Sequence, residues 1–422
     1  MDFSLLLPLL VSGVGLYLLI KLRFFFIFRP LCTGRTIVFS LKNKKSRQAL
    51  SLALAGTLGV GNVFGVCAGI MIGGAGCVFW MLVSSLFSMV IKYAECVLAH
   101  DTRTDGGGGM HRVIFLTFSR AGKYLAPLYA LLCTALALFM GSAMQSSAVS
   151  GVARAAFNIN PFLSALILAL LLLFGVFGGG EKIEKITAKL IPLTTIFYIL
   201  LTLSVIFVNI SEIPRVVSEI FASAFTPSAA CGGVLAVLTS GALREGYARG
   251  ILSNEAGVGT SSLAHTRAGH RTAAESGVCG IVEVFFDTVV LCMLTALALL
   301  SSGRSLAQAD PMSVITDAVT SSLSHWLAAP LALSILVFAY STVICWYFYG
   351  TECVYYLVGK GARVPFAIAF FIFLFVGALL NSLPLVRVID LLLLAMCILT
   401  LSAILARRER IFELSREFTE RK

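Results

Sequence analysis

Long apolar runs without a charged residue constrain this chain more than any other feature. Examples are Leu125 to Phe139, Phe162 to Phe177 and Leu391 to Ala406. With their apolar flanks they approach the roughly 20 residues that a bilayer-spanning helix needs. Of the 422 residues, 58% are hydrophobic and 13% are charged, whereas about a quarter of an ordinary soluble domain is charged. The chain is therefore predicted to be an all-α integral membrane protein.

A hydropathy window of about 19 residues predicts about eleven transmembrane helices. The predicted spans are 3–20, 50–73, 76–98, 124–150, 162–179, 190–208, 230–250, 275–302, 325–350, 364–381 and 388–406. The first span lacks the basic n-region and the cleavage site of a signal peptide, so it is interpreted as a transmembrane helix.

Lys and Arg fall mainly in alternate loops of this span pattern. The basic set consists of the linker from Lys21 to Arg47, residues 101–123, 182–189, 244–271 and 360–363, and the tail from Arg407. The other loops hold only Arg154, Arg215, Arg304 and Arg387. The positive-inside rule then predicts a multi-pass plasma membrane protein, in a bacterium an inner membrane protein, with its N-terminus outside and its C-terminus in the cytoplasm. The basic excess needs no nucleic-acid partner.

Cysteine and histidine patterns give no support for an enzyme or a resident cofactor. Eleven cysteines are scattered without a C-x-x-C pair, and five histidines lack an H-E-x-x-H spacing, so neither a disulfide framework nor a metal cage is indicated. No nucleophile with its base stands out in mid-span. A channel would need a repeated filter motif, and none is visible.

Glycine clusters predict where helices are interrupted. The densest cluster runs from Gly56 to Asn62 in the second span. One interpretation is an unwound segment whose amides face a carboxylate and whose carbonyls face a cation. The alternative is helix packing, because Gly61, Gly65, Gly69 and Gly73 form a small-residue stripe at spacing four. The stripe favours packing, and the segment from Gly56 to Asn62 favours binding.

A second break is predicted in the seventh span, where Thr239-Ser240-Gly241 precedes Arg244. Two interrupted spans five apart are typical of a 5+5 inverted repeat. The predicted organisation is an extra N-terminal helix with a basic linker (1–48), a core (49–406) and a cytoplasmic tail (407–422).

Two long motifs resemble the alanine or glycine:cation symporter family. They are "GTLGVGNVFGVCAGIMIGGAGCVFWMLVSSLFSMVIKYAE" from Gly56 to Glu95 and "SNEAGVGTSSLAH" from Ser253 to His265, and "FAYSTVICWYFYG" at 338–350 is a further match. The resemblance implies sodium-driven uptake of alanine or glycine and a core similar to the leucine-transporter fold. One departure is Met110-His111-Arg112, where the family has Met-Tyr-Tyr, and it bears on substrate preference.

The resemblance to the leucine-transporter fold also implies a sodium site between the broken helix and the ninth span. Ser341 and Thr342 follow Phe338 by three and four residues, which puts both hydroxyls and the Phe338 carbonyl within one turn. Carbonyls of Ala55 and Leu58 would complete the site. The alternative is that the two hydroxyls bond back to their own helix.

A zwitterionic substrate needs donors for its carboxylate and a small apolar wall. Backbone amides of the broken segment could supply the donors, and Gln145 lies in an otherwise largely apolar span, where it contacts either substrate or another helix. Trp346 and Phe338 are weaker candidates for a wall or a gate. The predicted substrate-binding residues are Gly59, Val60, Gly61, Gln145, Ser240, Gly241 and Trp346.

Intramembrane acids form a third group of candidates. Glu283 and Asp287 are one turn apart in the eighth span and could hold a second cation or a proton beside Asn62. The alternative is a structural pair satisfied by backbone or by Arg244. Lys92 and Glu95 are predicted to form a local pair near a cytoplasmic end. The segment Ser253 to His265 is predicted to fall in the cytoplasmic loop after the seventh span and to form an ordered turn or short helix that acts in an inner gate.

Together these features predict a secondary active transporter that brings a small neutral amino acid, alanine, glycine or D-alanine, into the cell with sodium. No cofactor is expected, and sodium is the coupling ion. The alternative is a proton-coupled carrier of the same fold in which Glu283 or Asp287 titrates.

Overall fold

The computed structural model describes residues 5–23, 34, 42–104, 108–176, 179–225, 241–267, 270, 272–304, 310–380 and 382–420. Within these ranges the chain is helical and forms no sheet. The first half comprises α1 (Leu6–Lys21), α4 (Lys44–Thr57), η2 (Gly61–Gly65), α5 (Val66–Gly73), α6 (Gly76–Asp101), α7 (Met110–Thr117), α8 (Ser119–Leu136), η3 (Ala137–Met144), α9 (Gln145–Phe157), α10 (Pro161–Val176), α11 (Gly179–Val208), η4 (Ile210–Glu212) and α12 (Ile213–Phe225).

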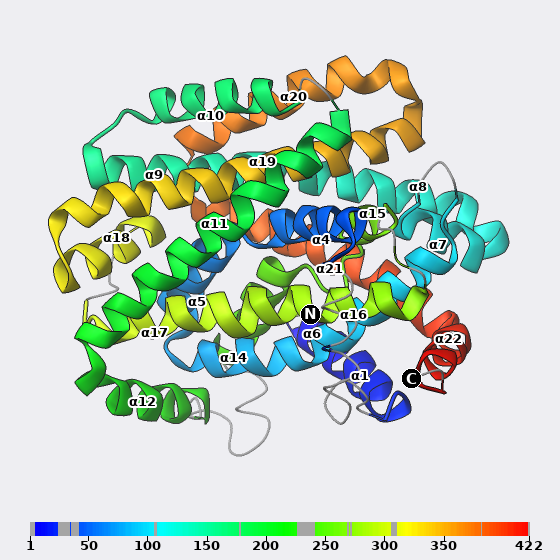
Figure 1. The fold of residues 1–422 in the computed structure, drawn as a ribbon, viewed down its shortest axis with the longest axis horizontal. Coiled ribbons are helices and arrows are strands. Elements are labelled where there is room, and N and C mark those ends of the chain that lie inside the picture. Colours follow the sequence, from blue (N-terminus) through cyan, green and yellow to red (C-terminus); the bar gives the residue numbers. More distant parts are fainter. Residues whose placement is uncertain are drawn as a thin grey trace.

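The second half comprises α14 (Gly241–Asn254), α15 (Ser262–His265), α16 (Ala273–Val284), η5 (Phe285–Cys292), α17 (Met293–Ser301), α18 (Pro311–Ser322), η6 (His325–Leu327), α19 (Ala328–Val358), η7 (Lys360–Ala362), α20 (Arg363–Leu379), α21 (Ser382–Ala406) and α22 (Arg408–Glu420). In Figure 1 the long helices run side by side, and α4 and α5 lie in their midst. We call the end that carries α7, α15 and α22 the α4 end, and the end that carries α12 and α18 the α5 end.

The described residues contain seven helices long and apolar enough to cross a membrane, or eight if the bent pair α4 and α5 counts as one span. Helices α1 and α10 are shorter apolar helices. Ten of the eleven predicted spans coincide with helices, and the seventh coincides in part, because residues 226–240 lie outside the described ranges. The all-α membrane fold is therefore confirmed, and the count of eleven stays a prediction.

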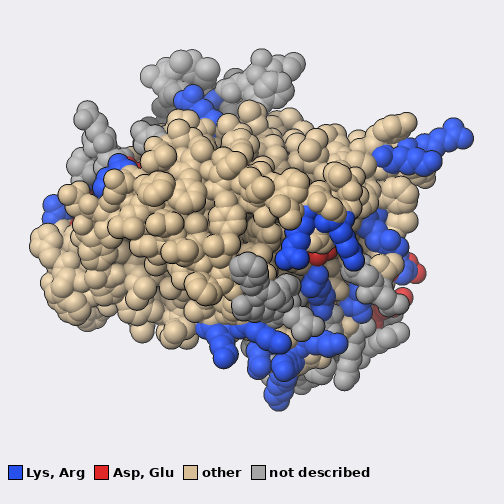
Figure 2. Space-filling view, turned by 90° about the horizontal axis from the view of Figure 1, so that it is seen from above, with Lys and Arg blue, Asp and Glu red and all other residues tan. Residues whose placement is uncertain are grey.

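Exposed side chains also fit a membrane protein. The face in Figure 2 is mostly uncharged, and its Lys and Arg lie mainly towards the right and lower right. Several helices expose large apolar side chains. Phe174 on α10 is 72% exposed, for example, and Leu391 on α21 is 63% exposed. Water would disfavour so many, whereas lipid solvates them.

The first predicted break is present. Helix α4 ends at Thr57, Leu58 is extended with ψ of 91°, and the chain resumes as a π-helix at Gly61. The two parts are bent by 41°. The break follows from the glycines at 56, 59 and 61, which lower helix propensity.

The second predicted break cannot be located, because Thr239 and Ser240 lie outside the described residues, but the described chain is interrupted about fifteen residues later. Helix α14 begins at Gly241, whose carbonyl lies beside Gly73 at the end of α5, and it runs without interruption to Asn254. The chain unwinds over residues 255–261 and re-forms one helical turn, α15. Ser253 to His265 is thus buried inside the bundle as an interrupted helix, with the expected short helix present as α15, and is not an exposed loop.

The misplacement has a physical cause in the polarity of α14. Arg249 is 1% exposed because it pairs with Glu245 and Asp390, at 3.1 Å and 2.5 Å. Charges neutralised in this way can lie inside a bundle, but they lower the hydropathy of the helix that carries them. The span therefore appears to end near residue 250, and Arg244 and Arg249 are wrongly counted with the loop residues 244–271.

The long helix α6 supports the second broken span and the helix that follows it. Its first half packs along α14, and its second half packs along α16. Glycine permits the close approach, since a Cβ on Gly250 would lie 2.4 Å from the Ser84 hydroxyl and one on Gly277 would lie 2.5 Å from the Tyr93 ring. Helix α22 closes the α4 end, where Arg410 binds Asp101 through two hydrogen bonds.

Candidate functional site

Asn62 organises the first break. Its Oδ1 accepts a hydrogen bond from the Gly59 amide at 2.9 Å, and its Nδ2 donates to Asp287 Oδ1 at 2.6 Å and to Ser253 Oγ at 2.9 Å. Asn62 is 2% exposed. One side chain therefore connects the two broken spans with η5. The predicted amide donor of Gly59 is engaged by Asn62 and is not free.

Asp287 lies at the centre of this polar network. Ser253 Oγ and Thr288 Oγ1 both donate to Asp287 Oδ2 at 2.8 Å, and Asn254 Nδ2 donates to Thr288 Oγ1 at 3.0 Å. Asp287 is fully buried. The predicted pairing of Asp287 with Asn62 is present, and the sequence analysis missed the contribution of Ser253 and Asn254 because it placed them in a loop.

Glu283 does not share this site. Its Oε1 lies 3.2 Å from Lys92 Nζ and accepts a bond from Ser261 Oγ at 2.7 Å, while its Oε2 lies 3.1 Å from His265 Nε2. Lys92 and Glu283 are both fully buried. The sequence analysis predicts Glu95 as the partner of Lys92 near a helix end, but the structure places the ammonium inside the bundle, against the Glu283 carboxylate of α16.

The predicted sodium residues meet where α19 crosses the first break. A Cβ on Gly59 would lie 2.3 Å from Thr342 Oγ1, so this hydroxyl faces the broken segment directly. Thr342 Oγ1 is buried and has no hydrogen-bond partner in the described part of the chain. Ser341 Oγ instead donates to the Phe338 carbonyl at 2.8 Å, as the alternative interpretation predicts. Ala55 and Leu58 are buried on the adjoining end of α4.

Gln145 and Trp346 approach the same region from η3, α9 and α19. A Cβ on Gly141 would lie 2.3 Å from Trp346 Cβ, so the backbone of η3 lies directly against this side chain. Gln145 lies one turn further on and donates to the Met140 carbonyl at 3.1 Å. Gln145 Oε1 and Trp346 Nε1 are buried and unpartnered among the described residues. Buried unpaired polar groups are costly. These two atoms and Thr342 Oγ1 therefore mark the places where a polar ligand would be stabilised.

One predicted substrate residue, Gly241, is not brought to this site, and another lies outside the described residues. Gly241 lies at the α5 end, one full helix away from Ser253, and Ser240 lies outside the described residues. Val60 and Gly61 are buried in the break, where Gly61 faces Ser253. The second helix contributes its C-terminal end, Ser253 and Asn254, in place of its beginning.

Ion pairs connect each half of the second broken span to a neighbouring helix. At the α5 end, Arg249 on α14 binds Asp390 on α21. At the α4 end, Arg267, which follows α15, binds Glu352 on α19 at 3.3 Å and lies over the Phe348 ring at 4.4 Å. These two pairs connect the half-helices to α21 and α19 above and below the central site.

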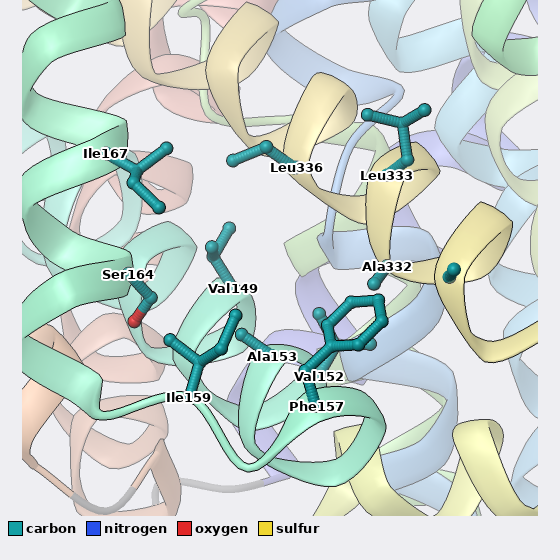
Figure 3. Close-up of a pocket in the computed structure, with 11 residues that line it drawn as sticks. Val149, Val152, Ala153, Phe157, Ile159, Ser164, Ile167, Ala332, Leu333 and Leu336 are labelled. Atoms are coloured by element: carbon teal, nitrogen blue, oxygen red, sulfur yellow. The ribbon is translucent and has the colours of Figure 1, made fainter.

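The cavities near the two ends differ in chemistry from the central site. Figure 3 shows a pocket of about 270 Å³ between the end of α9, the start of α10 and α19, lined by apolar side chains such as Val149, Ile167 and Leu336. A second pocket of about 450 Å³ at the α4 end is lined by His111, Arg112 and Glu352. Burial lowers the pKa of His111 to about 4, so this side chain is neutral at physiological pH.

Comparison with known proteins agrees with this geometry. Residues 2–422 match the family described as the sodium:alanine symporter family. The chain is 33% identical to the sodium/alanine symporter AgcS of Methanococcus maripaludis, over 89% of this chain and 86% of that protein. It is 32% identical to YrbD of Bacillus subtilis, named a putative sodium/proton-dependent alanine carrier, over 76% of this chain and 70% of that one.

The fold is similar to that of the transporter MhsT, solved in complex with L-phenylalanine, with a TM-score of 0.62 and 14% identity over 85% of this chain and 87% of MhsT. A leucine-transporter-like core of broken helices and a family match over nearly the whole chain describe a secondary amino-acid transporter and not an enzyme. The chain belongs to the sodium:alanine symporter family.

Proposed function

We propose that this protein imports a small neutral amino acid, alanine or glycine, together with sodium. The observation that carries the proposal is the Thr342 hydroxyl, which is buried, unpartnered among the described residues and directed at Gly59 in the first break. A singly charged hard cation is stabilised by such hydroxyls and by carbonyls freed from a helix. Ala55, Leu58, Phe338 and Ser341 are the further proposed ligands.

The substrate is proposed to lie between the first break, Gln145 and Trp346. The unpaired Gln145 Oε1 and Trp346 Nε1 offer one acceptor and one donor for a zwitterion. The Gly141 backbone lies directly against Trp346, so we expect room beside this side chain for a substrate side chain no larger than a methyl group. The name of AgcS, a sodium/alanine symporter, supports the same substrate class.

Alternating access would then consist of opening one ion pair at a time. Release of Arg249 from Asp390 frees α14 at the α5 end, and release of Arg267 from Glu352 frees α15 at the α4 end. The excess of basic loops at the α4 end supports a cytoplasmic location for this end, with the N-terminus outside.

The test is uptake of labelled alanine and glycine into proteoliposomes with sodium and proton gradients imposed separately. We expect uptake to require sodium and the Thr342→Ala, Ser341→Ala double variant to lose sodium dependence while it still reaches the membrane. Asp317→Asn, at an exposed position of α18, is the control and keeps wild-type uptake. Uptake that ignores sodium would overturn the proposal.

A second candidate is proton coupling through Asp287. The observation that favours it is the direct contact of this buried carboxyl with Asn62 at the first break, together with the sodium/proton-dependent name of YrbD. It predicts uptake driven by a pH gradient without sodium and lost in Asp287→Asn.

A further inference from the structure

Glu255 is the first residue after α14, in the middle of the second broken span. Its amide still donates to the Ile251 carbonyl at 2.8 Å, but its φ is +54°, in the left-handed region. Helices commonly end on such a residue, and glycine or asparagine usually occupies it because a Cβ is disfavoured there. The two glycines that follow, Gly257 and Gly259, are also left-handed. A glutamate held in this conformation points to a use for its side chain.

The Glu255 carboxyl is sealed from solvent and only half satisfied. The residue is fully buried, and Oε2 accepts a hydrogen bond from Thr260 Oγ1 at 2.5 Å. Oε1 is buried and has no hydrogen-bond partner among the described residues. An ionised carboxylate with a bare oxygen in a low-dielectric interior is far less stable than a neutral carboxylic acid.

The charges around Glu255 act in both directions: the Lys92 ammonium favours its ionised form, and the Glu283 and Asp287 carboxyl groups disfavour it. In the described parts of α6, α16, η5 and the unwound segment, four fully buried carboxyl groups face one buried ammonium. Lys92 is already paired with Glu283, and Asp287 is satisfied by Asn62, Ser253 and Thr288. The titratable groups that interact with Glu255 are Lys92 of α6, Tyr129 and Cys133 of α8, Glu283 of α16, Asp287 of η5, and Cys345 and Tyr349 of α19. Glu95 of α6 lies against Gly257 and Gly259 of the same segment, and His265 of α15 binds Glu283 close by.

The position of Glu255 at the end of a helix also favours the neutral carboxylic acid. The C-terminal end of α14 carries the negative pole of the helix dipole, which repels an anion and stabilises a cation or a neutral acid. Burial, the neighbouring acids, the helix end and the bare oxygen favour the neutral acid, and they act against the attraction of Lys92 and the hydrogen bond from Thr260.

We propose that Glu255 is a proton-binding site of the closed transporter, distinct from the sodium site at Thr342. The bound proton sits on the carboxyl group at the second break, and opening of the α4 end brings this segment into contact with water and allows the proton to leave. The consequence for transport rests on the proposed amino-acid uptake, whereas the protonation state itself does not.

The test is infrared spectroscopy of the full-length protein in lipid at neutral pH. We expect a C=O band of a protonated carboxylic acid that shifts on H/D exchange, disappears in Glu255→Gln, shifts in frequency in Glu255→Asp, and persists in the exposed control Asp317→Asn. Absence of the band from the wild-type protein overturns the proposal without any variant. A band that survives in Glu255→Gln, or that vanishes only in Glu95→Gln, also overturns it.

The alternative is that Glu255 binds sodium in place of a proton, and the infrared measurement distinguishes the two. If Glu255 binds sodium, the acid band is absent in sodium and appears when choline replaces sodium at the same pH.

A transport assay tests the consequence of Glu255 protonation for uptake. We expect wild-type uptake at saturating sodium to fall several-fold as internal pH rises, and Glu255→Gln to show a flat pH profile. Failure of sodium dependence alone would leave the infrared result intact and would count against the proposed function only.

Discussion

The two helix breaks face each other but differ in construction. The first is short, uncharged and held by a single side chain, Asn62. The second spans residues 255–261, contains a glutamate and is held from several sides: Tyr129 donates to the Val258 carbonyl at 3.0 Å, Thr400 to the same carbonyl at 3.3 Å, and Lys92 to Ser261 at 2.7 Å. This difference in construction suggests that the two breaks have different roles. The first break offers backbone and hydroxyl groups to ligands, and the second holds a buried acid in a segment that is bonded to several neighbouring helices.

The largest effect on folding stability is expected at the buried ion pair beside the second break, Lys92 and Glu283. Lys92→Met leaves Glu283 buried without its ammonium, which costs about 3–5 kcal/mol of folding free energy. We expect loss of folded protein in detergent, measured by thermal unfolding and size-exclusion chromatography. The Lys92→Met, Glu283→Gln double variant removes both charges and should recover much of this loss. Equal stability of the single and double variants would show that the pair does not anchor the break.

A steric change at the first break is expected to act on ligand binding more than on the fold. In Gly59→Ala the new methyl group lies 2.3 Å from Thr342 Oγ1, and such overpacking costs about 1–3 kcal/mol. We expect sodium to lose its ability to raise the melting temperature. The control is Gly65→Ala, whose Cβ has its nearest neighbour at 3.5 Å. A sodium response that survives in Gly59→Ala would separate this segment from the ion site.

A backbone change at the second break should have a smaller effect, and the effect should be on folding stability alone. Gly257 has a φ of +85°, so Gly257→Ala costs about 1–2 kcal/mol through the left-handed conformation. Gly361→Ala, at a position with open space and no positive φ, provides the control in thermal unfolding. An unchanged melting temperature for both variants would mean that the second break tolerates a different backbone conformation.

The smallest effect is expected at the ion pair of the α4 end. Both side chains of the Arg267–Glu352 pair are 35% exposed, so Arg267→Gln should change stability by only about 0.2–1 kcal/mol. The expected effect of Arg267→Gln is therefore on the conformation of the α4 end more than on stability. We expect a cysteine introduced at Thr351 of α19 to react faster with a water-soluble thiol reagent in the Arg267→Gln background. Equal reaction rates would argue against a gating role for this pair.

Sequence patterns predicted the first break and the span architecture well. The glycines at 56, 59 and 61 disturb a helix by local propensity alone, and local effects are readable from one sequence. The second break was misplaced because its helix owes its stability to Asp390, which is 141 residues from Arg249. The role of Lys92 was missed for the same reason, since its partner Glu283 is distant in sequence. Long-range charge pairing is the information that hydropathy lacks.

The buried arginine of α14 has a consequence for how the protein is made. This half-helix carries Arg244, Glu245 and Arg249, so it would partition poorly into lipid on its own as it leaves the ribosome. The acid that neutralises Arg249 belongs to α21, which is synthesised last among the membrane helices. Assembly of the second broken span therefore has to wait for the C-terminal helices, and nascent chains truncated before residue 390 are expected to hold α14 in an incompletely inserted state.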